Sequence, residues 1–316
     1  MKHIIIFLLS LILFSVTAQA RLTHYALKNT ESSILLEKIN RRYHTNCQTI
    51  TTKHVNERGV ITYPILYKFC LSRDKWERSK KVLYFFHGVN GSPRDWLQKL
   101  SLKKIRNFLW ARSEASLPAV ASVSFGNMYF LGIDKTKDLF LHKVMPHIEN
   151  LIGGDIQKRL LMGVSMGGAN VAQLILKEPQ YFNGAVMICP AIINIHPWSS
   201  YDEVDDYIMQ TGAWKFLIDR FITSNDLILE NFKDFNHYNT KANVYYLAPT
   251  NLGPQTPPLY ISVGENDQFG FQQGSHFFAD WAIRNGVPTT FHSYPGKGHC
   301  VLNAETIGKY LLKQLI

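Results

Sequence analysis

Residues 159–168 read RLLMGVSMGG, and this stretch decides the fold. It begins with a short apolar run typical of a buried strand, and the residues from Gly167 to Lys177 have helical spacing. The glycines two positions before and two positions after Ser165 allow the backbone to turn sharply from strand to helix. The stretch therefore predicts a strand, a tight turn that exposes Ser165, and a helix.

Apolar runs and helical segments alternate on both sides of this turn. We expect further strands at 81–86, 119–125, 185–189, 259–263 and 289–294, and helices at about 95–112, 139–151, 273–284 and 304–315. Such alternation predicts βαβ units, and hence an α/β fold with a mostly parallel twisted sheet and helices on both faces. Residues 21–316 are expected to form a single domain.

Two segments depart from this alternation. Strand-like runs at 48–55 and 61–69 flank a turn, so we expect an N-terminal β-hairpin over about 48–70. The segment from about 195 to 256 is rich in aromatic residues and has some helical spacing. It is interpreted as a lid-like insertion over the carboxyl edge of the sheet, with a peripheral pair of packing helices as the alternative.

The N-terminus has the pattern of a signal peptide over residues 1–20. Lys2 supplies a positive start, residues 4–14 are almost wholly apolar, and Ala18-Gln19-Ala20 has the small residues of a cleavage site. The apolar run is short for crossing about 30 Å of hydrocarbon, so we expect no stable membrane anchor after cleavage. The sequence thus predicts an exported protein, periplasmic or secreted.

The net charge of +10 comes from 34 Lys and Arg against 24 Asp and Glu. The basic residues are scattered and do not alternate with aromatic residues as in nucleic-acid-binding segments, so no nucleic-acid partner is expected. We also expect no metal and no organic cofactor. The oligomeric state is left open.

Two of the four cysteines have a local argument for pairing. Cys47 and Cys70 would lie nearly opposite each other in the predicted hairpin, and an oxidising compartment would permit a disulfide. A shift of one residue in register would instead point them to opposite faces, so both outcomes stay open. Cys189 and Cys300 are interpreted as small, buried apolar residues.

Ser165 is the candidate nucleophile. A serine hydroxyl is a weak nucleophile, so it requires a neighbouring base and an exposed position. The oxyanion that forms during attack requires fixed N–H donors. We expect the backbone N–H of Met166, at the helix start, and that of Val89, after the strand at 81–86, to supply them, with Asn90 next in order.

The candidate acid and base each follow the end of a predicted strand. In the chain order typical of a G-x-S-x-G turn, the acid follows the serine and the histidine comes last. Asp267 and His299 fit this order, with His299 as the general base and Asp267 holding its imidazole in the required tautomer. Glu265 is the competing acid. His87 precedes Ser165 and is interpreted as a structural residue of its loop.

Four motifs carry a resemblance to a known superfamily: HGVNGS at 87–92, GVSMGG at 163–168, GEND at 264–267 and GH at 298–299. Together they resemble the α/β-hydrolase superfamily, in the branch of esterase D-like enzymes, feruloyl and acetyl esterases and polyester depolymerases. The resemblance covers Lys81 to the C-terminus without the insertion. It implies a serine esterase that cleaves a small-molecule or polymer-linked carboxylic ester through an acyl-enzyme.

One position departs from this branch, and two other functions stay open. Asn170 stands where esterase D-like chains usually carry Gly, which argues against carrying over their thioester substrate. The first alternative is a serine peptidase of the prolyl-oligopeptidase type, although we expect no N-terminal propeller within the residues before Lys81. The second is a catalytically silent binding module with the same fold.

Overall fold

The computed structural model describes residues 45–55, 61–72, 80–111, 117–126, 134–223 and 226–315. The chain divides into two compact units, Met1–Cys47 and Gln48–Ile316, and the architecture below is that of the second. The expected signal peptide at 1–20 lies outside the described residues. Among the helices that are described, none is long and apolar enough to cross a membrane.

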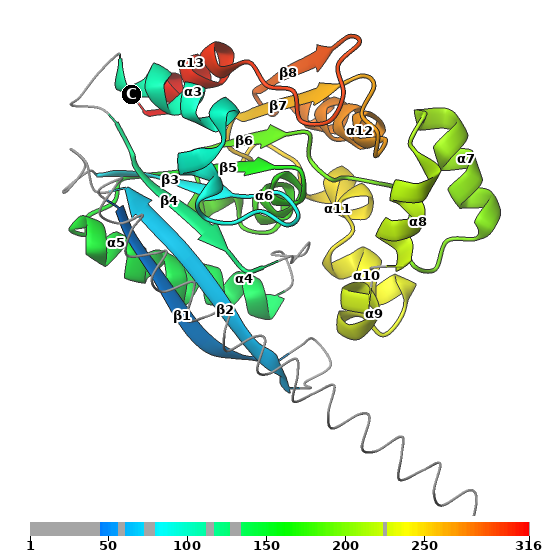
Figure 1. Ribbon diagram of the computed structural model, residues 1–316, viewed down its shortest axis with the longest axis horizontal. Helices are drawn as coiled ribbons and strands as arrows, with labels where there is room; N and C mark the ends of the chain where they lie inside the picture. Colours follow the sequence, from blue (N-terminus) through cyan, green and yellow to red (C-terminus); the bar gives the residue numbers. More distant parts are fainter. Residues whose placement is uncertain are drawn as a thin grey trace, which may run out of the picture. The chain divides into compact units, whose positions relative to one another are not determined.

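An eight-stranded sheet, whose first strand begins three residues before Gln48, forms the centre of the second unit (Figure 1). Its strands are β1 (Thr45–Val55), β2 (Ile61–Ser72), β3 (Lys81–Phe86), β4 (Ala119–Ser124), β5 (Lys158–Val164), β6 (Gly184–Ile188), β7 (Leu259–Gly264) and β8 (Thr289–Tyr294), in the order β1-β2-β4-β3-β5-β6-β7-β8. Strands β3 to β8 run parallel, and β2 pairs with β4 in the antiparallel sense. The predicted mostly parallel sheet is confirmed.

Helices cover both faces of the sheet. They are α2 (Asp95–Gln98), α3 (Leu100–Trp110), α4 (Asp134–Leu139), the π-helical turn η1 (Phe140–Val144), α5 (Met145–Ile152), α6 (Met166–Lys177), the short 3-10 helix η2 (Pro179–Tyr181), α12 (Phe271–Arg284) and α13 (Ala304–Leu315). Alternate side chains of β3 point to opposite faces: Phe85 packs on Trp96 of α2, whereas Tyr84 and Phe86 pack on Phe140 of η1. Because β3 is buried on both faces, its sequence is continuously apolar.

Two predicted helices are interrupted. The expected helix at 95–112 breaks at Lys99, whose ψ of 125° is extended, and this residue separates α2 from α3. The expected helix at 139–151 contains the π-helical turn directly before α5, which has Pro146 in its first turn. Proline has no N–H to continue the hydrogen-bond ladder, so the regular helix restarts there.

In its described residues, the segment from 195 to 256, expected as a lid-like insertion with a pair of packing helices as the alternative, contains five helices. They are α7 (Tyr201–Thr211), α8 (Lys215–Thr223), α9 (Asp226–Asn231), α10 (Phe235–Lys241) and α11 (Val244–Asn251). Helix α11 packs against α6 and α12, and α7 contacts α12 (Figure 1). Apolar side chains of the segment form small clusters, one of which joins Val204 and Tyr207 of α7 to Phe271 at the start of α12.

Candidate active site

Ser165 occupies the turn between β5 and α6, with φ 55° and ψ −118°. This backbone conformation is unfavourable for a residue with a side chain, and the surrounding structure must hold it. A Cβ on Gly163 would come closer than 3.0 Å to the Gly167 carbonyl, and one on Gly167 would come that close to the carbonyl of Phe86. Both positions therefore require glycine, which explains the G-x-S-x-G pattern.

Main-chain hydrogen bonds fix the turn on both sides of Ser165. Its N–H donates to the carbonyl of Ile188 at 2.9 Å. Its own carbonyl accepts from Ala169 at 3.1 Å and from Ala191 at 3.0 Å. The serine is thus tied to the end of β6 as well as to its own helix, and the hydroxyl is held at the carboxyl edge of the sheet.

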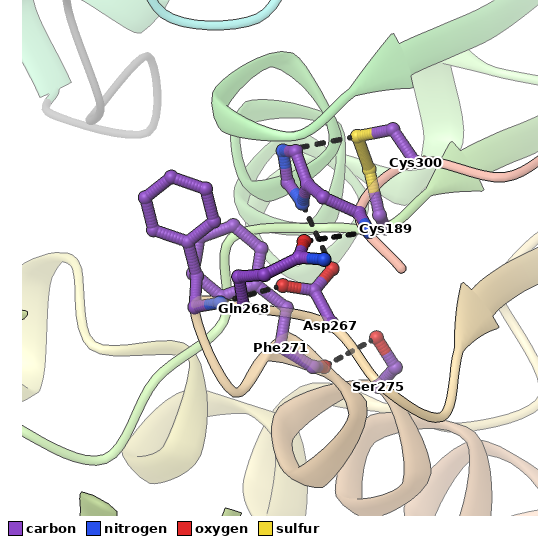
Figure 2. The surroundings of a disulfide bond; sticks show 8 residues. Cys189, Asp267, Gln268, Phe271, Ser275 and Cys300 are labelled. Carbon is purple, nitrogen blue, oxygen red and sulfur yellow. Dashed lines mark hydrogen bonds and ion pairs between the residues drawn. A yellow bond between two sulfur atoms is a disulfide. The ribbon is translucent and has the colours of Figure 1, made fainter. Parts of the chain in front are cut away.

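His299 is held by two residues of the loop that follows β7. Its Nδ1 lies 2.8 Å from Oδ2 of Asp267, a fully buried side chain. The other carboxylate oxygen of Asp267 accepts the N–H of Phe269 at 2.9 Å, and the N–H of His299 donates to Oε1 of Gln268 at 3.0 Å (Figure 2). These bonds fix the imidazole and leave Nε2 for other groups. Gln268 was not anticipated from the sequence.

The other acid and the other histidines have different partners. Glu265 pairs with Nε2 of His276 at 3.0 Å, on the first turns of α12. His87 is buried and bonds the carbonyl of Gly88 at 2.7 Å and the hydroxyl of Ser124 at 2.6 Å. Burial lowers the pKa of His87, which favours its neutral form. These contacts give His87 a structural part in its loop.

Ser165 and His299 line one cleft with a volume of about 290 Å³. Val89 also lines it, and Met166 is buried at the first position of α6. A Cβ on Gly88 would lie 3.9 Å from the Ser165 hydroxyl, so the backbone before Val89 runs beside that hydroxyl. Among the described residues, the cleft is lined by Phe85, Gly88, Val89, Asp95, Lys99, Ser101, Leu102, Val164, Ser165, Phe269, His299, Cys300 and Leu302.

The described residues that line this cleft all lie outside the segment 195–256. The segment instead supports the loop after β7. The hydroxyl of Tyr207 donates to the carbonyl of Phe269 at 2.8 Å, and the N–H of Trp214 donates to the carbonyl of Gln268 at 2.8 Å. The side chain of Gln272 donates to the carbonyl of Thr211 at 2.6 Å. The segment therefore acts on the site through the loop that holds His299.

A disulfide joins Cys189 to Cys300, which corrects the interpretation of both as isolated apolar residues. The pair is 111 residues apart in sequence, with the Cα atoms 5.0 Å apart. Cys189 directly follows β6 and Cys300 directly follows His299, so two loops at the same edge of the sheet bring them together. This placement at strand ends was the missed signal. The side chains of Cys47 and Cys70 lie outside the described residues.

The disulfide reaches the candidate base itself. Sγ of Cys300 lies 3.2 Å from Nε2 of His299. Within the described part of the chain, no hydrogen bond joins Nε2 to the hydroxyl of Ser165. Cys189, His299 and Cys300 are also the group of potential metal-ligating residues found there, with ligand atoms within 4.8 Å of one another.

The sequence matches the model of the prolyl oligopeptidase family over residues 143–316, which is more than half of the chain. The chain belongs to the prolyl oligopeptidase family. The matched region runs from η1 to α13 and includes Ser165, Asp267 and His299. No curated protein matches the sequence.

Solved structures of esterases share the fold. A ferulic acid esterase is 16% identical with a TM-score of 0.54, and the match covers 86% of this chain and 96% of the esterase. Carboxyl esterase 2 of Tuber melanosporum is 17% identical with a TM-score of 0.58, and the match covers 86% of this chain and 87% of the esterase. An esterase of Pyrobaculum calidifontis is 19% identical with a TM-score of 0.55, and the match covers 90% of this chain and 89% of the esterase. The predicted α/β-hydrolase fold is confirmed.

Proposed function

We propose that this chain is an exported serine esterase that hydrolyses a carboxylic ester through Ser165, His299 and Asp267. The observation that carries the proposal is the hydrogen bond from His299 Nδ1 to the buried Asp267, at a cleft that Ser165 also lines. An imidazole oriented by a carboxylate beside a serine on a strained strand-to-helix turn is the arrangement that activates a hydroxyl.

In the proposed reaction, Nε2 of His299 takes the proton of Ser165 as the hydroxyl oxygen attacks the ester carbonyl. The N–H groups of Met166 and Val89 stabilise the oxyanion, aided at Met166 by the positive end of the α6 dipole. His299 then returns the proton to the leaving alcohol. A water molecule, activated by the same imidazole, releases the acid from the acyl-enzyme. Hydrogen bonds in such sites commonly close only when substrate binds.

The size and lining of the cleft favour a compact acyl group. Its volume of about 290 Å³ is at the small end of ligand sites. Leu102, Phe269 and Leu302 supply apolar surface, whereas Lys99 is paired with Asp95 at 2.6 Å. We therefore propose short or compact acyl esters, on a small molecule or a polymer, as the substrates.

The test compares the wild-type chain with Ser165→Ala on p-nitrophenyl esters of increasing acyl length. We expect Ser165→Ala to lose at least a thousandfold in kcat/KM and to lose labelling by a fluorophosphonate probe. Normal turnover and labelling in Ser165→Ala would overturn the mechanism. Absence of labelling in the folded wild type would favour a silent binding module.

Membership of the prolyl oligopeptidase family favours a second candidate, a serine peptidase. The two functions use the same residues and differ in the leaving group, an alcohol or an amine. Aminoacyl anilides assayed beside the p-nitrophenyl esters separate them. Higher kcat/KM on the anilides than on esters of the same acyl group would replace the esterase by the peptidase.

Export rests on the pattern of residues 1–20. The positive Lys2, the apolar run and the small residues before Arg21 are those of a cleaved signal peptide. We propose that the mature protein begins at Arg21 and acts in the periplasm or outside the cell. N-terminal sequencing of the protein recovered after export tests this, and a recovered Met1 would contradict it.

A further inference from the structure

Two sulfur atoms adjoin the base that the proposed function assigns. Cys300 Sγ is 3.2 Å from His299 Nε2, and the disulfide joins Cys300 Sγ to Cys189 Sγ. The three potential ligand atoms lie within 4.8 Å of one another, so small shifts of the side chains would let one metal ion contact all three. Two cysteines and one histidine are also a ligand set found on zinc in enzymes that keep a fourth position open.

The surroundings of His299 are those of a metal-binding histidine. Such histidines almost always bond a carboxylate or carbonyl through the other ring nitrogen, which fixes the tautomer and directs the lone pair at the metal. Here Asp267 bonds Nδ1 at 2.8 Å, and Nε2, on the other side of the ring, contacts Cys300 Sγ at 3.2 Å. The same bond that prepares the base for Ser165 therefore prepares a metal ligand.

Main-chain anchors independent of the disulfide hold the ligand-bearing segments. The N–H of Cys189 donates to the carbonyl of Ser262 at 2.6 Å, and the next residue but one, Ala191, donates to Ser165. The N–H of His299 is held by Gln268. Breaking the bond between the sulfurs leaves these anchors in place, so the three side chains stay together at the edge of the sheet.

We propose that reduction of the Cys189–Cys300 disulfide creates a site for one soft divalent cation, Zn²⁺ being the type case, bound by both thiolates and by His299 Nε2. An external dithiol supplies two electrons and two protons by thiol–disulfide exchange and is itself oxidised to a disulfide. The cation then displaces the proton of each thiol. The consequence for catalysis rests on the proposed function: a cation on Nε2 removes the base from Ser165.

The dimensions of such a site agree with the positions of the side chains. Zinc binds thiolate at about 2.3 Å and imidazole at about 2.0 Å, so its ligand atoms lie roughly 3.5–3.8 Å apart. Reduced sulfurs must separate to about this distance, while Nε2 is already 3.2 Å from Cys300 Sγ. The cleft lined by Ser165, His299 and Cys300 leaves room for the fourth position on its side.

The experiment uses Co²⁺ as the probe, because tetrahedral cobalt thiolates have strong visible and near-ultraviolet bands. The full chain is reduced with dithiothreitol, freed of it under nitrogen, and titrated beside the oxidised chain. We expect a thiolate band in the reduced chain that Zn²⁺ abolishes, and none in the oxidised chain. The band should survive C47S/C70S, which removes the other two cysteines, and vanish in C189S/C300S.

A matched pair of histidine variants tests the third ligand. His299→Ala should weaken Co²⁺ binding at least tenfold, whereas His276→Ala, which removes a histidine paired with Glu265, should leave it unchanged. Circular dichroism of each variant checks that it is folded. A reduced chain without the band, a band that persists in folded C189S/C300S, or equal binding by folded His299→Ala would overturn the site.

Fluorophosphonate labelling of Ser165 reports separately on the base. One equivalent of Zn²⁺ should reduce labelling of the reduced chain at least tenfold, with recovery on adding EDTA, and should leave the oxidised chain unaffected. Cobalt binding with labelling that zinc does not alter would overturn the loss of the base. If the chain binds cobalt but the probe labels neither its reduced nor its oxidised form, the proposed function is rejected and the metal site is kept.

Discussion

Exchange of the Asp267 carboxylate for an amide gives the sharpest test of the site. Asp267→Asn has nearly the same shape, and its Oδ1 can still accept the N–H of Phe269. The group that faces His299 Nδ1 at 2.8 Å becomes an NH₂ donor, however. Nδ1 must then accept, so the proton moves to Nε2, and the imidazole can no longer take the proton of Ser165.

The size of the effect follows from the geometry of this pair. With about 4 Å between charge centres and an effective dielectric constant of about 20, the carboxylate stabilises the imidazolium by about 4 kcal/mol. This corresponds to about 10³-fold in rate. The wrong tautomer raises the loss toward about 10⁴-fold, as in other serine triads. We expect kcat on a p-nitrophenyl ester to fall by about 10³–10⁴-fold with KM little changed.

Glu265→Gln is the matched control, because it makes the same chemical change two residues earlier. Glu265 pairs with His276, and both side chains are partly exposed, so kcat should stay within about twofold of wild type. The assay is initial-rate kinetics on both variants, with thermal unfolding to check that each is folded. A loss below tenfold in Asp267→Asn, or an equal loss in Glu265→Gln, would refute the assignment of the acid.

Two further predictions concern the turn and the buried histidine. Gly167→Ala places a Cβ against the carbonyl of Phe86, so the free energy of unfolding measured in urea should fall by about 3 kcal/mol or more. In Gly184→Ala the new Cβ meets only side-chain atoms, so the free energy of unfolding should fall by about 1 kcal/mol. Equal losses in the two variants would contradict this reasoning. Burial lowers the pKa of His87 in the folded chain. As pH falls below about 6.5, the unfolded chain therefore takes up a proton at this histidine before the folded chain does, and the free energy of unfolding decreases. The free energy of unfolding should therefore depend less on pH between 6.5 and 5 in His87→Asn than in wild type, and an unchanged dependence would reject the idea.

The sequence by itself determined the strands, the turn and the order of the candidate residues. Parallel strands buried on both faces must be continuously apolar, and the close approach at Gly163 and Gly167 admits no side chain, so both features are visible in the printed residues. Asp267 and His299 could be predicted at one edge of the sheet because each follows a strand. These are consequences of local sequence and of the periodicity of strands and helices.

Only the tertiary structure decided which groups touch. The sequence left Glu265 and Asp267 as competing acids, and the path of the loop after β7 brings Asp267 to His299 and turns Glu265 to His276. The bond between Cys189 and its distant partner could not be read from local pairing, since it depends on how two loops converge beyond β6 and β8. Loop conformation is set by packing between segments far apart in the chain, and no local pattern of residues carries that information.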